Sequence, residues 1–272
     1  MKKVLTIAGS STSGGAGLQA DLKAFAKQGV YGMTALTTIV VQNPNDWSHK
    51  AYPTDLSLLC AQLNTILDGI GVDAVKTGML GSVELIELIA SYLDKHKPKF
   101  VVVDPVIACK GADAVMNKDV ANALATEMVK RAYIITPNLL EAGILTGMGT
   151  ITTIEGMKDA AKKLHEMGAK SVLIKGGSRL FSTDDESCKE KCPTKAIDLF
   201  YDGKDFIILE NELIQPAYNH GAGCTYAATI AALLAKGETP ESAVRTANKI
   251  VHDGIKNGFE LNQFVGCLNI LS

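Results

Sequence analysis

The 272-residue sequence has little excess charge, few aromatic residues and no long apolar run. Lysine and arginine together number 27, against 29 aspartate and glutamate residues, which gives a formal net charge of −2. Because nucleic-acid-binding surfaces gather basic residues in blocks or stripes, this balance argues against nucleic acid as a partner. No apolar run reaches the roughly 18 residues that a transmembrane helix needs, so we expect no membrane association.

Cysteine is too sparse for a small secreted protein held together by disulfides. The six cysteines are scattered along a chain long enough to bury a large core. The N-terminal MKK precedes only a short apolar run, whereas a signal peptide needs a longer one. We therefore expect reduced thiols, a cytoplasmic location and a single domain over residues 1–272.

The sequence does contain short apolar runs that alternate with longer segments of helical periodicity. The apolar runs are rich in Val, Ile and Thr and predict strands at 4–9, 34–41, 73–79, 100–107, 133–138, 171–177 and 196–203. The periodic segments predict helices at 17–28, 55–69, 83–95, 118–130, 154–167, 224–235 and 240–256. This alternation is typical of βαβ units, so we predict an α/β fold with a mostly parallel sheet flanked by helices.

Local signals refine the prediction at four places. The sequence TTIE at 152–155 predicts a capping box, and Thr239-Pro240 predicts an N-cap followed by proline in the first turn. Residues 31–47 are expected to include a strand that projects from the main sheet. The polar segment 178–195 is interpreted as a mobile loop; its two cysteines, Cys188 and Cys192, lack the further ligands of a zinc site.

Polar and glycine-rich residues follow most of the predicted strands. The strand ends read AGSSTSGGAG, VQN, KTGM, DPVIACKG, TPNLLEA and IKGG. Ligands of open α/β sheets bind beyond the carboxyl ends of the strands. The sequence therefore predicts a binding site at this edge of the sheet.

The first glycine-rich loop, residues 9–17, is compared with two nucleotide-binding motifs. GAGLQA (15–20) fits G-x-G-x-x-A, yet the next predicted strand ends without the acidic residue that would hold a ribose. The Walker pattern also fails, because no Lys-Ser/Thr pair follows Gly14 and Gly15. We interpret the loop as a contact to a small substrate, with a tight turn that binds nothing as the alternative.

The second glycine-rich turn, NHGAGC (219–224), carries a sharper signal. Gly221, Ala222 and Gly223 allow backbone N–H groups to converge at a helix N-terminus, which suits the oxygens of a phosphoryl group in transfer. Cys224 stands at this helix start, where a lowered thiol pKa would let it act as a general base. The alternative is a small buried residue that caps a packed helix.

Four residues at other strand ends are candidates for the same chemistry. Asp104 ends an apolar strand and is able to hold Mg²⁺ through water. Asn138 and Glu141 lie three residues apart on an incoming helix turn, so both can face one point; for Glu141, ordinary stabilisation of the first turn is the alternative. Lys175 in IKGG is a candidate contact to a nucleotide phosphate.

These segments together resemble the ribokinase-like superfamily. Within it, they are similar to the branch of hydroxymethylpyrimidine/phosphomethylpyrimidine kinases and related bacterial pyridoxal kinases. The similarity covers essentially the whole chain, with LTIAGSSTSGGAGLQADLKAF, KTGML, VVVDPVIACKGADAV, ITPNLLEA, IKGG and NHGAGCT in the expected order. It implies a three-layer α/β/α fold with a small lid around 30–50. The implied reaction is ATP- and Mg²⁺-dependent phosphorylation of a hydroxymethyl group on a heteroaromatic ring.

The resemblance also implies roles for individual residues. Cys224 corresponds to the base position of the anion hole, where many superfamily members carry aspartate, and Gly221, Ala222 and Gly223 build that hole. Asp104, Asn138 and Glu141 would serve Mg²⁺ and phosphates, with Asp104 and Glu141 on the metal, and Lys175 would serve the nucleotide. The positions implied for the substrate pocket are Gly9, Asp21, Gln42, Met79 and Cys109. A homodimer with the 30–50 segment near the interface fits the resemblance.

Two groups of residues point to different vitamin precursors. Cys109-Lys110-Gly111 resembles the pyridoxal kinases, and near an aldehyde Cys109 could add reversibly to the carbonyl or relay a proton with Cys224. Gln42-Asn43 resembles the pyrimidine kinases, since a glutamine amide can donate to a ring nitrogen and accept from an amino group.

We expect pyridoxal, pyridoxine or pyridoxamine as substrate, with hydroxymethylpyrimidine or its phosphate as the alternative. Ser11 departs from both types, because the family usually has aspartate at this position. A non-catalytic vitamin-binding protein is the alternative from a different class. The complete set of Asp104, Asn138, Glu141 and Cys224 argues against it, because a sensor needs no base.

Overall fold

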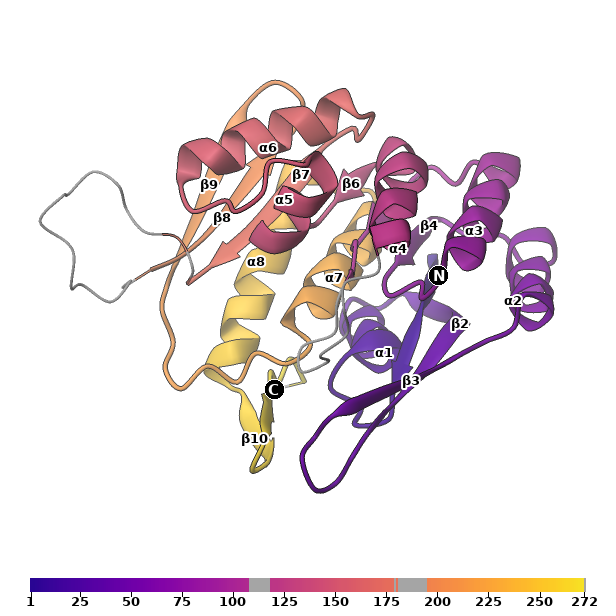
Figure 1. Ribbon diagram of the computed structural model, residues 1–272, viewed down its shortest axis with the longest axis horizontal. Coiled ribbons are helices and arrows are strands. Elements are labelled where there is room, and N and C mark those ends of the chain that lie inside the picture. Colours follow the sequence, from indigo (N-terminus) through magenta and orange to yellow (C-terminus); the bar gives the residue numbers. More distant parts are fainter. Residues whose placement is uncertain (108–117, 179, 181–194, 272) are drawn as a thin grey trace, which may run out of the picture.

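The structure is a computed structural model that describes residues 1–107, 118–178, 180 and 195–271. A nine-stranded sheet in the order β3-β2-β1-β4-β5-β6-β7-β8-β9 forms its middle layer (Figure 1). The strands are β1 (Lys3–Ser11), β2 (Tyr31–Gln42), β3 (His49–Pro53), β4 (Ala74–Thr77), β5 (Val101–Val103), β6 (Ile134–Ile135), β7 (Val172–Gly177), β8 (Lys195–Tyr201) and β9 (Phe206–Glu212).

The central strands are parallel, as predicted. Strands β2, β1, β4, β5, β6 and β7 pair in parallel, whereas β3, β8 and β9 run antiparallel to their neighbours. Helices cover both faces of this sheet, so successive residues of a central strand are both buried. In β1, Val4 packs into one core cluster and Leu5 into the other, which explains why these strands read as continuous apolar runs.

The helices divide between the two faces of the sheet. In the described residues these are α1 (Gly17–Lys27), α2 (Leu56–Leu63), α3 (Val83–His96), α4 (Lys118–Ala123), α5 (Leu139–Thr146), α6 (Ile154–Glu166), α7 (Ala222–Lys236) and α8 (Pro240–Lys256). The apolar side chains of α2 to α6 belong to one core cluster, and those of α1, α7 and α8 belong to the other. The predicted three-layer α/β/α arrangement is therefore confirmed.

Strand β2 extends beyond the main sheet, as predicted for residues 31–47. Its far end pairs with β3, from Thr38 opposite Pro53 to Gln42 opposite His49, and this hairpin projects from the body of the molecule (Figure 1). Strand β3 was not predicted, because HKAYP is mostly exposed and lacks an apolar run. The same holds for the small hairpin of β10 (Phe259–Asn262) and β11 (Val265–Cys267).

Helix α6 begins one residue later than the predicted capping box. Thr153 is the N-cap, and its hydroxyl accepts a hydrogen bond from the Gly156 amide at 3.0 Å. Because Gly156 has no side chain to return the bond, a reciprocal box cannot form there. The prediction for α8 is confirmed, with Thr239 as N-cap and Pro240 in the first turn.

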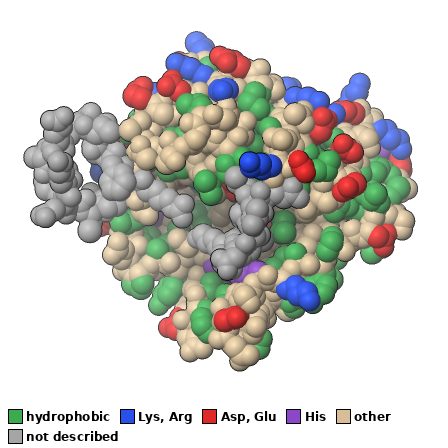
Figure 2. All heavy atoms as spheres, in the orientation of Figure 1, with side chains coloured by type: hydrophobic (Ala, Val, Ile, Leu, Met, Phe, Trp, Pro, Cys, Tyr) green, Lys and Arg blue, Asp and Glu red, His purple; other side chains and the backbone are tan. Residues whose placement is uncertain are grey.

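Charged side chains of both signs are interspersed on the face that Figure 2 shows, without a large patch of one sign. Within the part of the chain that the structure describes, no helix is both long and apolar enough to span a membrane. The predicted 178–195 loop lies almost wholly outside the described residues, together with Cys188 and Cys192. Cys109 lies outside them as well.

Candidate active site

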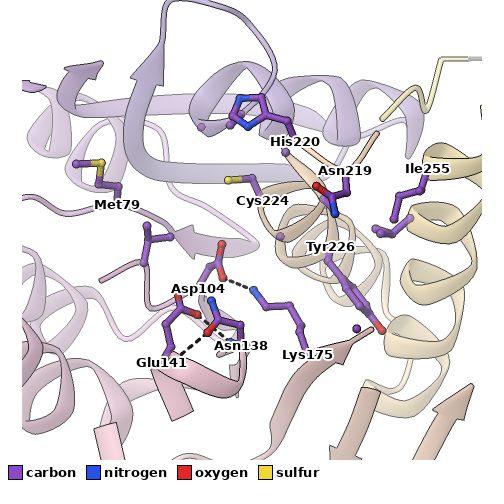
Figure 3. Close-up of a pocket in the computed structure, with 18 of the residues that line it drawn as sticks. Met79, Asp104, Asn138, Glu141, Lys175, Asn219, His220, Cys224, Tyr226 and Ile255 are labelled. Carbon is purple, nitrogen blue, oxygen red and sulfur yellow. Dashed lines mark hydrogen bonds and ion pairs between the residues drawn. The ribbon is translucent and has the colours of Figure 1, made fainter. Parts of the chain in front are cut away.

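A cavity of about 440 Å³ lies at the carboxyl edge of the parallel strands. Met79 and Ile255 lie toward its opposite ends, with Cys224, Asp104 and Lys175 between them (Figure 3). Most of the residues predicted for the site line this one cavity: Gly9, Gln42, Met79, Asp104, Asn138, Glu141, Lys175, Gly221, Ala222, Gly223 and Cys224. The predicted convergence of the strand ends is therefore present in the structure.

The glycine turn before α7 requires glycine at position 221. Gly221 is the N-cap of α7 and has φ +89°, a left-handed conformation that residues with a side chain rarely adopt. A Cβ atom added to Gly221 would lie 1.9 Å from the carbonyl oxygen of Gly15. The turn therefore depends on glycine both for its dihedral angle and for its packing against the first glycine-rich loop.

The first turn of α7 carries Cys224 into the cavity. The Ala222 amide donates to the carbonyl of Asn219 at 3.1 Å, so it closes the turn rather than pointing to a ligand. Gly223 and Cys224 supply the next two amides of a helix start, where N–H groups lack partners within the helix. These two amides are the anion donors that the turn offers, a narrower set than the sequence predicted.

The Cys224 thiol does not have the lowered pKa that its place at a helix start predicted. Burial raises its pKa from 9.0 to about 11, and the charges of Asp21 and Asp104 act in the same direction. The ammonium of Lys76 and the backbone amide of Gly17 oppose this rise. The helix N-terminus alone does not outweigh desolvation, so the thiol is protonated at neutral pH.

Asp104 and Lys175 form an ion pair in the middle of the cavity. The Lys175 Nζ lies 2.8 Å from Asp104 Oδ1, and the Thr136 hydroxyl also donates to that oxygen at 3.2 Å (Figure 3). Burial opposes ionisation of Asp104, but the charges of Lys175 and Lys76 hold its pKa below the ordinary value. Asp104 is therefore a carboxylate at neutral pH, as binding of a cation requires.

Asn138 and Glu141 cap the start of α5 reciprocally. The Asn138 side chain accepts from the Glu141 amide at 2.9 Å, and the Glu141 carboxylate accepts from the Asn138 amide at 2.8 Å. The two side chains do face one point, and Glu141 also fulfils its alternative role in stabilising the first turn. Burial and the nearby Asp104 charge raise the pKa of Glu141 to about 7.

Gln42 lines the cavity with its amide already bound by the first glycine-rich loop. Its Oε1 accepts from the Ser13 amide at 3.2 Å, and its Nε2 donates to the Ser11 hydroxyl at 3.3 Å. Ser11, the position that departs from the family pattern, thus has a defined contact. The amide that was expected to read a pyrimidine ring is held by the protein itself.

Asp21 lies beneath the cavity rather than on its wall, contrary to the expected substrate contact. It is not among the cavity-lining residues, and it is fully buried. Its Oδ2 accepts from Lys76 Nζ at 2.8 Å and from the Thr6 hydroxyl at 2.6 Å. Asp21 therefore acts on the site through Lys76, which does line the cavity.

Several residues that line the cavity were not predicted from the sequence. Lys76 carries a signal that could have been used, because a lysine in the apolar strand run DAVKTGM demands a buried partner. Asp198, Asn211 and Asn248 also line the cavity. The Asp198 carboxylate accepts from the Gly176 amide and from Asn248, which also accepts from Asn211. No local motif marks these three, because they come from separate elements, β8, β9 and α8.

The carboxylates fit a magnesium ion that is shared with a nucleotide. Among the described residues, no group of three or more His, Cys, Asp or Glu side chains forms a metal-binding cage. Asp104 and Glu141 are two oxygen donors on the same cavity wall. Because Mg²⁺ is commonly held by one or two carboxylates together with phosphate oxygens and water, this donor set suits it.

Comparison with known proteins places the chain among vitamin kinases. Residues 11–269 match the family described as "Phosphomethylpyrimidine kinase". The pyridoxine kinase of Bacillus subtilis is 49% identical over 98% of this chain and 94% of its own length. The hydroxymethylpyrimidine/phosphomethylpyrimidine kinase of that organism is 37% identical over 94% and 89%. The structure of pyridoxal kinase from Staphylococcus aureus with AMP-PCP and pyridoxal superposes with a TM-score of 0.88. It is 44% identical and covers 99% of this chain and 94% of that one.

Proposed function

Because the chain belongs to the phosphomethylpyrimidine kinase family, we propose that it transfers the γ-phosphoryl group of ATP to the hydroxymethyl group of a vitamin B6 compound. Pyridoxal, pyridoxine and pyridoxamine are the substrates intended. The observation that carries the proposal is the cavity itself, in which the Cys224 helix start lies with the Asp104–Lys175 pair. A base, anion donors and charge for phosphates are the groups that phosphoryl transfer needs.

Each part of the cavity has a role in this reaction. The hydroxymethyl oxygen attacks the γ-phosphorus, its proton goes to the Sγ of Cys224 in its thiolate form, and the bond from phosphorus to the bridging β,γ-oxygen breaks to release ADP. The Gly223 and Cys224 amides hold the transferring group, and Lys175 neutralises phosphate charge. Mg²⁺, held by Asp104, Glu141 and the phosphates, would supply further charge neutralisation when bound.

Two observations favour a pyridine over a pyrimidine substrate. The pyridoxine kinase of Bacillus subtilis is the more similar of the two relatives, at 49% against 37% identity. The Gln42 amide is held by Ser11 and Ser13, which reduces its availability to a pyrimidine ring. Hydroxymethylpyrimidine kinase activity is the second candidate, because Gln42 does line the cavity. Addition of Cys109 to an aldehyde remains a prediction.

We extend the proposal to a single kinase domain over 1–272 that acts as a cytoplasmic homodimer. The free thiols of Cys60, Cys224 and Cys267 support a reducing compartment. The β2–β3 hairpin supports an interface, since it ends the sheet with an exposed edge and carries the exposed Ile39 and Tyr52. Sedimentation equilibrium of the purified chain tests the dimer, and a monomer at all concentrations would contradict it.

Steady-state release of ADP tests the function directly. Pyridoxal, pyridoxine, hydroxymethylpyrimidine and its monophosphate are compared in parallel with MgATP. A higher kcat/KM with pyridoxal or pyridoxine is the expected result. Turnover mainly of the pyrimidines, above all of the monophosphate, would move the protein to the second candidate function. Binding of a vitamin without ADP release from any compound would make it a non-catalytic binding protein.

A further inference from the structure

A fully buried ion pair adjoins the cavity that Cys224 lines. Lys76 of β4 and Asp21 of α1 are 2.8 Å apart, and both side chains are 0% exposed. Thr6 of β1 also donates to Asp21, which leaves the second carboxylate oxygen, Oδ1, buried without a hydrogen bond. The Lys76 side chain also borders the cavity.

Burial of this ion pair destabilises the folded state, so stability alone does not explain its presence. Moving two charges out of water costs several kcal/mol per ion, and their attraction repays this only when all polar atoms are satisfied. Here Asp21 Oδ1 is not satisfied. Position 78 also makes room for the ammonium, because a Cβ on Gly78 would lie 2.8 Å from Lys76 Nζ. The local structure is therefore built around a charged lysine.

The Cys224 thiol is the group that needs this charge. A thiol accepts a proton only after it has lost its own, and burial holds the pKa of Cys224 at about 11. The charged groups that act on it are Lys76 from β4, Asp21 from α1, Asp104 after β5 and Lys175 from β7. The Gly17 amide of α1 also favours the thiolate. Of these groups, Lys76 contributes the largest effect in favour of the thiolate.

We propose that Lys76, held in place by Asp21, is a positioning residue that sets the charge on the Cys224 sulfur. This inference rests on the proposed function, in which Cys224 receives the substrate proton. The Lys76 ammonium stabilises the thiolate, and the Asp21 carboxylate moderates that effect. The two members of one ion pair therefore act on Cys224 in opposite directions, and that opposition distinguishes an electrostatic role from a structural one.

Alkylation of Cys224 measures the thiolate without the need for turnover. The rate of iodoacetamide modification is followed from pH 6 to 11 on the peptide that contains Cys224, by mass spectrometry. Lys76→Met removes the ammonium at similar size and is expected to slow the reaction at pH 8 about tenfold, since one pKa unit changes the thiolate fraction about tenfold. Asp21→Asn removes the negative charge that opposes the effect of Lys76 on the thiolate. This variant is expected to accelerate the alkylation several-fold.

Two further variants keep the test valid if a single charge left alone impairs folding. Lys76→Arg retains the charge and is expected to react at nearly the wild-type rate. The double variant Asp21→Asn/Lys76→Met contains neither charge, so it avoids an uncompensated buried ion. Its rate is expected between those of wild type and Lys76→Met. Far-UV circular dichroism and the urea midpoint report folding of each variant.

The outcomes separate this inference from the proposed function. Rates that change in the same direction for Lys76→Met and Asp21→Asn, or a double variant that regains the wild-type profile, would overturn the role assigned to Lys76. Opposite shifts, with charge retention in Lys76→Arg, support it. Failure of all four vitamin compounds in the ADP assay would overturn the proposed function but would leave the alkylation result unchanged.

Discussion

The carbonyl oxygen of Gly15 occupies the space that a side chain at position 221 would need. A Cβ atom added to Gly221 would lie 1.9 Å from this oxygen. This contact joins two glycine-rich segments that are far apart in the sequence. The first loop therefore packs against the turn that leads to Cys224, independently of any contact that it makes with the substrate. The position of the start of α7 therefore depends on both segments.

The contact predicts that Gly221→Ala damages catalysis and stability together. The left-handed conformation alone costs about 1–2 kcal/mol for a residue with a Cβ atom, and the clash with Gly15 adds to this. We expect kcat to fall at least about 100-fold, because the anion donors of the turn are displaced. The measurements are ADP release and urea unfolding.

Gly237→Ala is the matched control for this substitution. Gly237 is the C-cap of the same helix, α7, and has φ +100°, but nothing lies within 4 Å of its added Cβ. We expect it to lose about 1–2 kcal/mol of stability with kcat retained. Equal losses of kcat in both variants would show that the contact with Gly15 is unimportant.

Replacement of Cys224 tests the assigned base. We expect Cys224→Ala to lower kcat about 100- to 10,000-fold, the usual contribution of a general base, with KM for ATP within about twofold of wild type. Cys224→Asp is expected to retain part of the activity, because a carboxylate can also accept the proton. Cys60→Ala on α2 is the control, and wild-type turnover in Cys224→Ala would contradict the assignment.

Ser11→Ala is expected to shift substrate preference toward the pyrimidine. The substitution removes the hydroxyl that accepts from Gln42 Nε2 at 3.3 Å, and so frees one end of the amide. A net hydrogen bond is worth about 1 kcal/mol, so the kcat/KM ratio of hydroxymethylpyrimidine to pyridoxine should rise roughly fivefold. Ser10→Ala is the control, since Ser10 instead accepts from Gln19. An unchanged ratio in Ser11→Ala would rule out this role of Ser11.

The raised pKa of Glu141 predicts a pH-dependent cost to the folded protein. The folded state binds this proton with a pKa of about 7, against an ordinary value of 4.5. The free energy of unfolding therefore falls as the pH rises from about 4.5 to about 7. Above that range the destabilisation has reached its full size. A pKa shift of this size lowers the free energy of unfolding by on the order of 3 kcal/mol.

Glu141→Gln removes that charge and can keep the bond to the Asn138 amide. We expect its advantage over wild type in urea unfolding to grow from pH 5 to pH 8. Glu87→Gln, at an exposed position on α3, should show no such trend. A Glu141→Gln advantage that is independent of pH would exclude the ionisation of Glu141 as its cause.

Most of the fold could be predicted from the sequence because the signals for its elements are local. Runs such as FVVV (100–103) and VLI (172–174) are apolar throughout, since their strands are covered on both faces, and each predicted strand is present. The edge strands β3 and β9 were missed because partner strands, rather than burial, define them. The same locality made Asp104, Lys175 and the 221–224 turn visible: Asp104 and Lys175 come at the ends of apolar strand runs, and the turn opens an apolar helix.

The remaining features of the site depend on contacts between distant segments. The pKa of Cys224 could not be inferred from its place at a helix start, because burial by other elements decides it. The Asp21–Lys76 pair joins residues 55 positions apart, and only folding shows that Asp21 lies below the cavity. The contact between Ser11 and Gln42 likewise gave no sign in either local segment.

Helix α7, which carries Cys224, is one of the most deeply buried elements of the molecule. From Thr225 to Ala235 every one of its residues is buried, and most are small, which leaves little freedom to move the helix. A substitution on this helix therefore disturbs the hydrophobic core as well as the cavity. The packing of the core therefore fixes the shape of the cavity on the side that α7 forms.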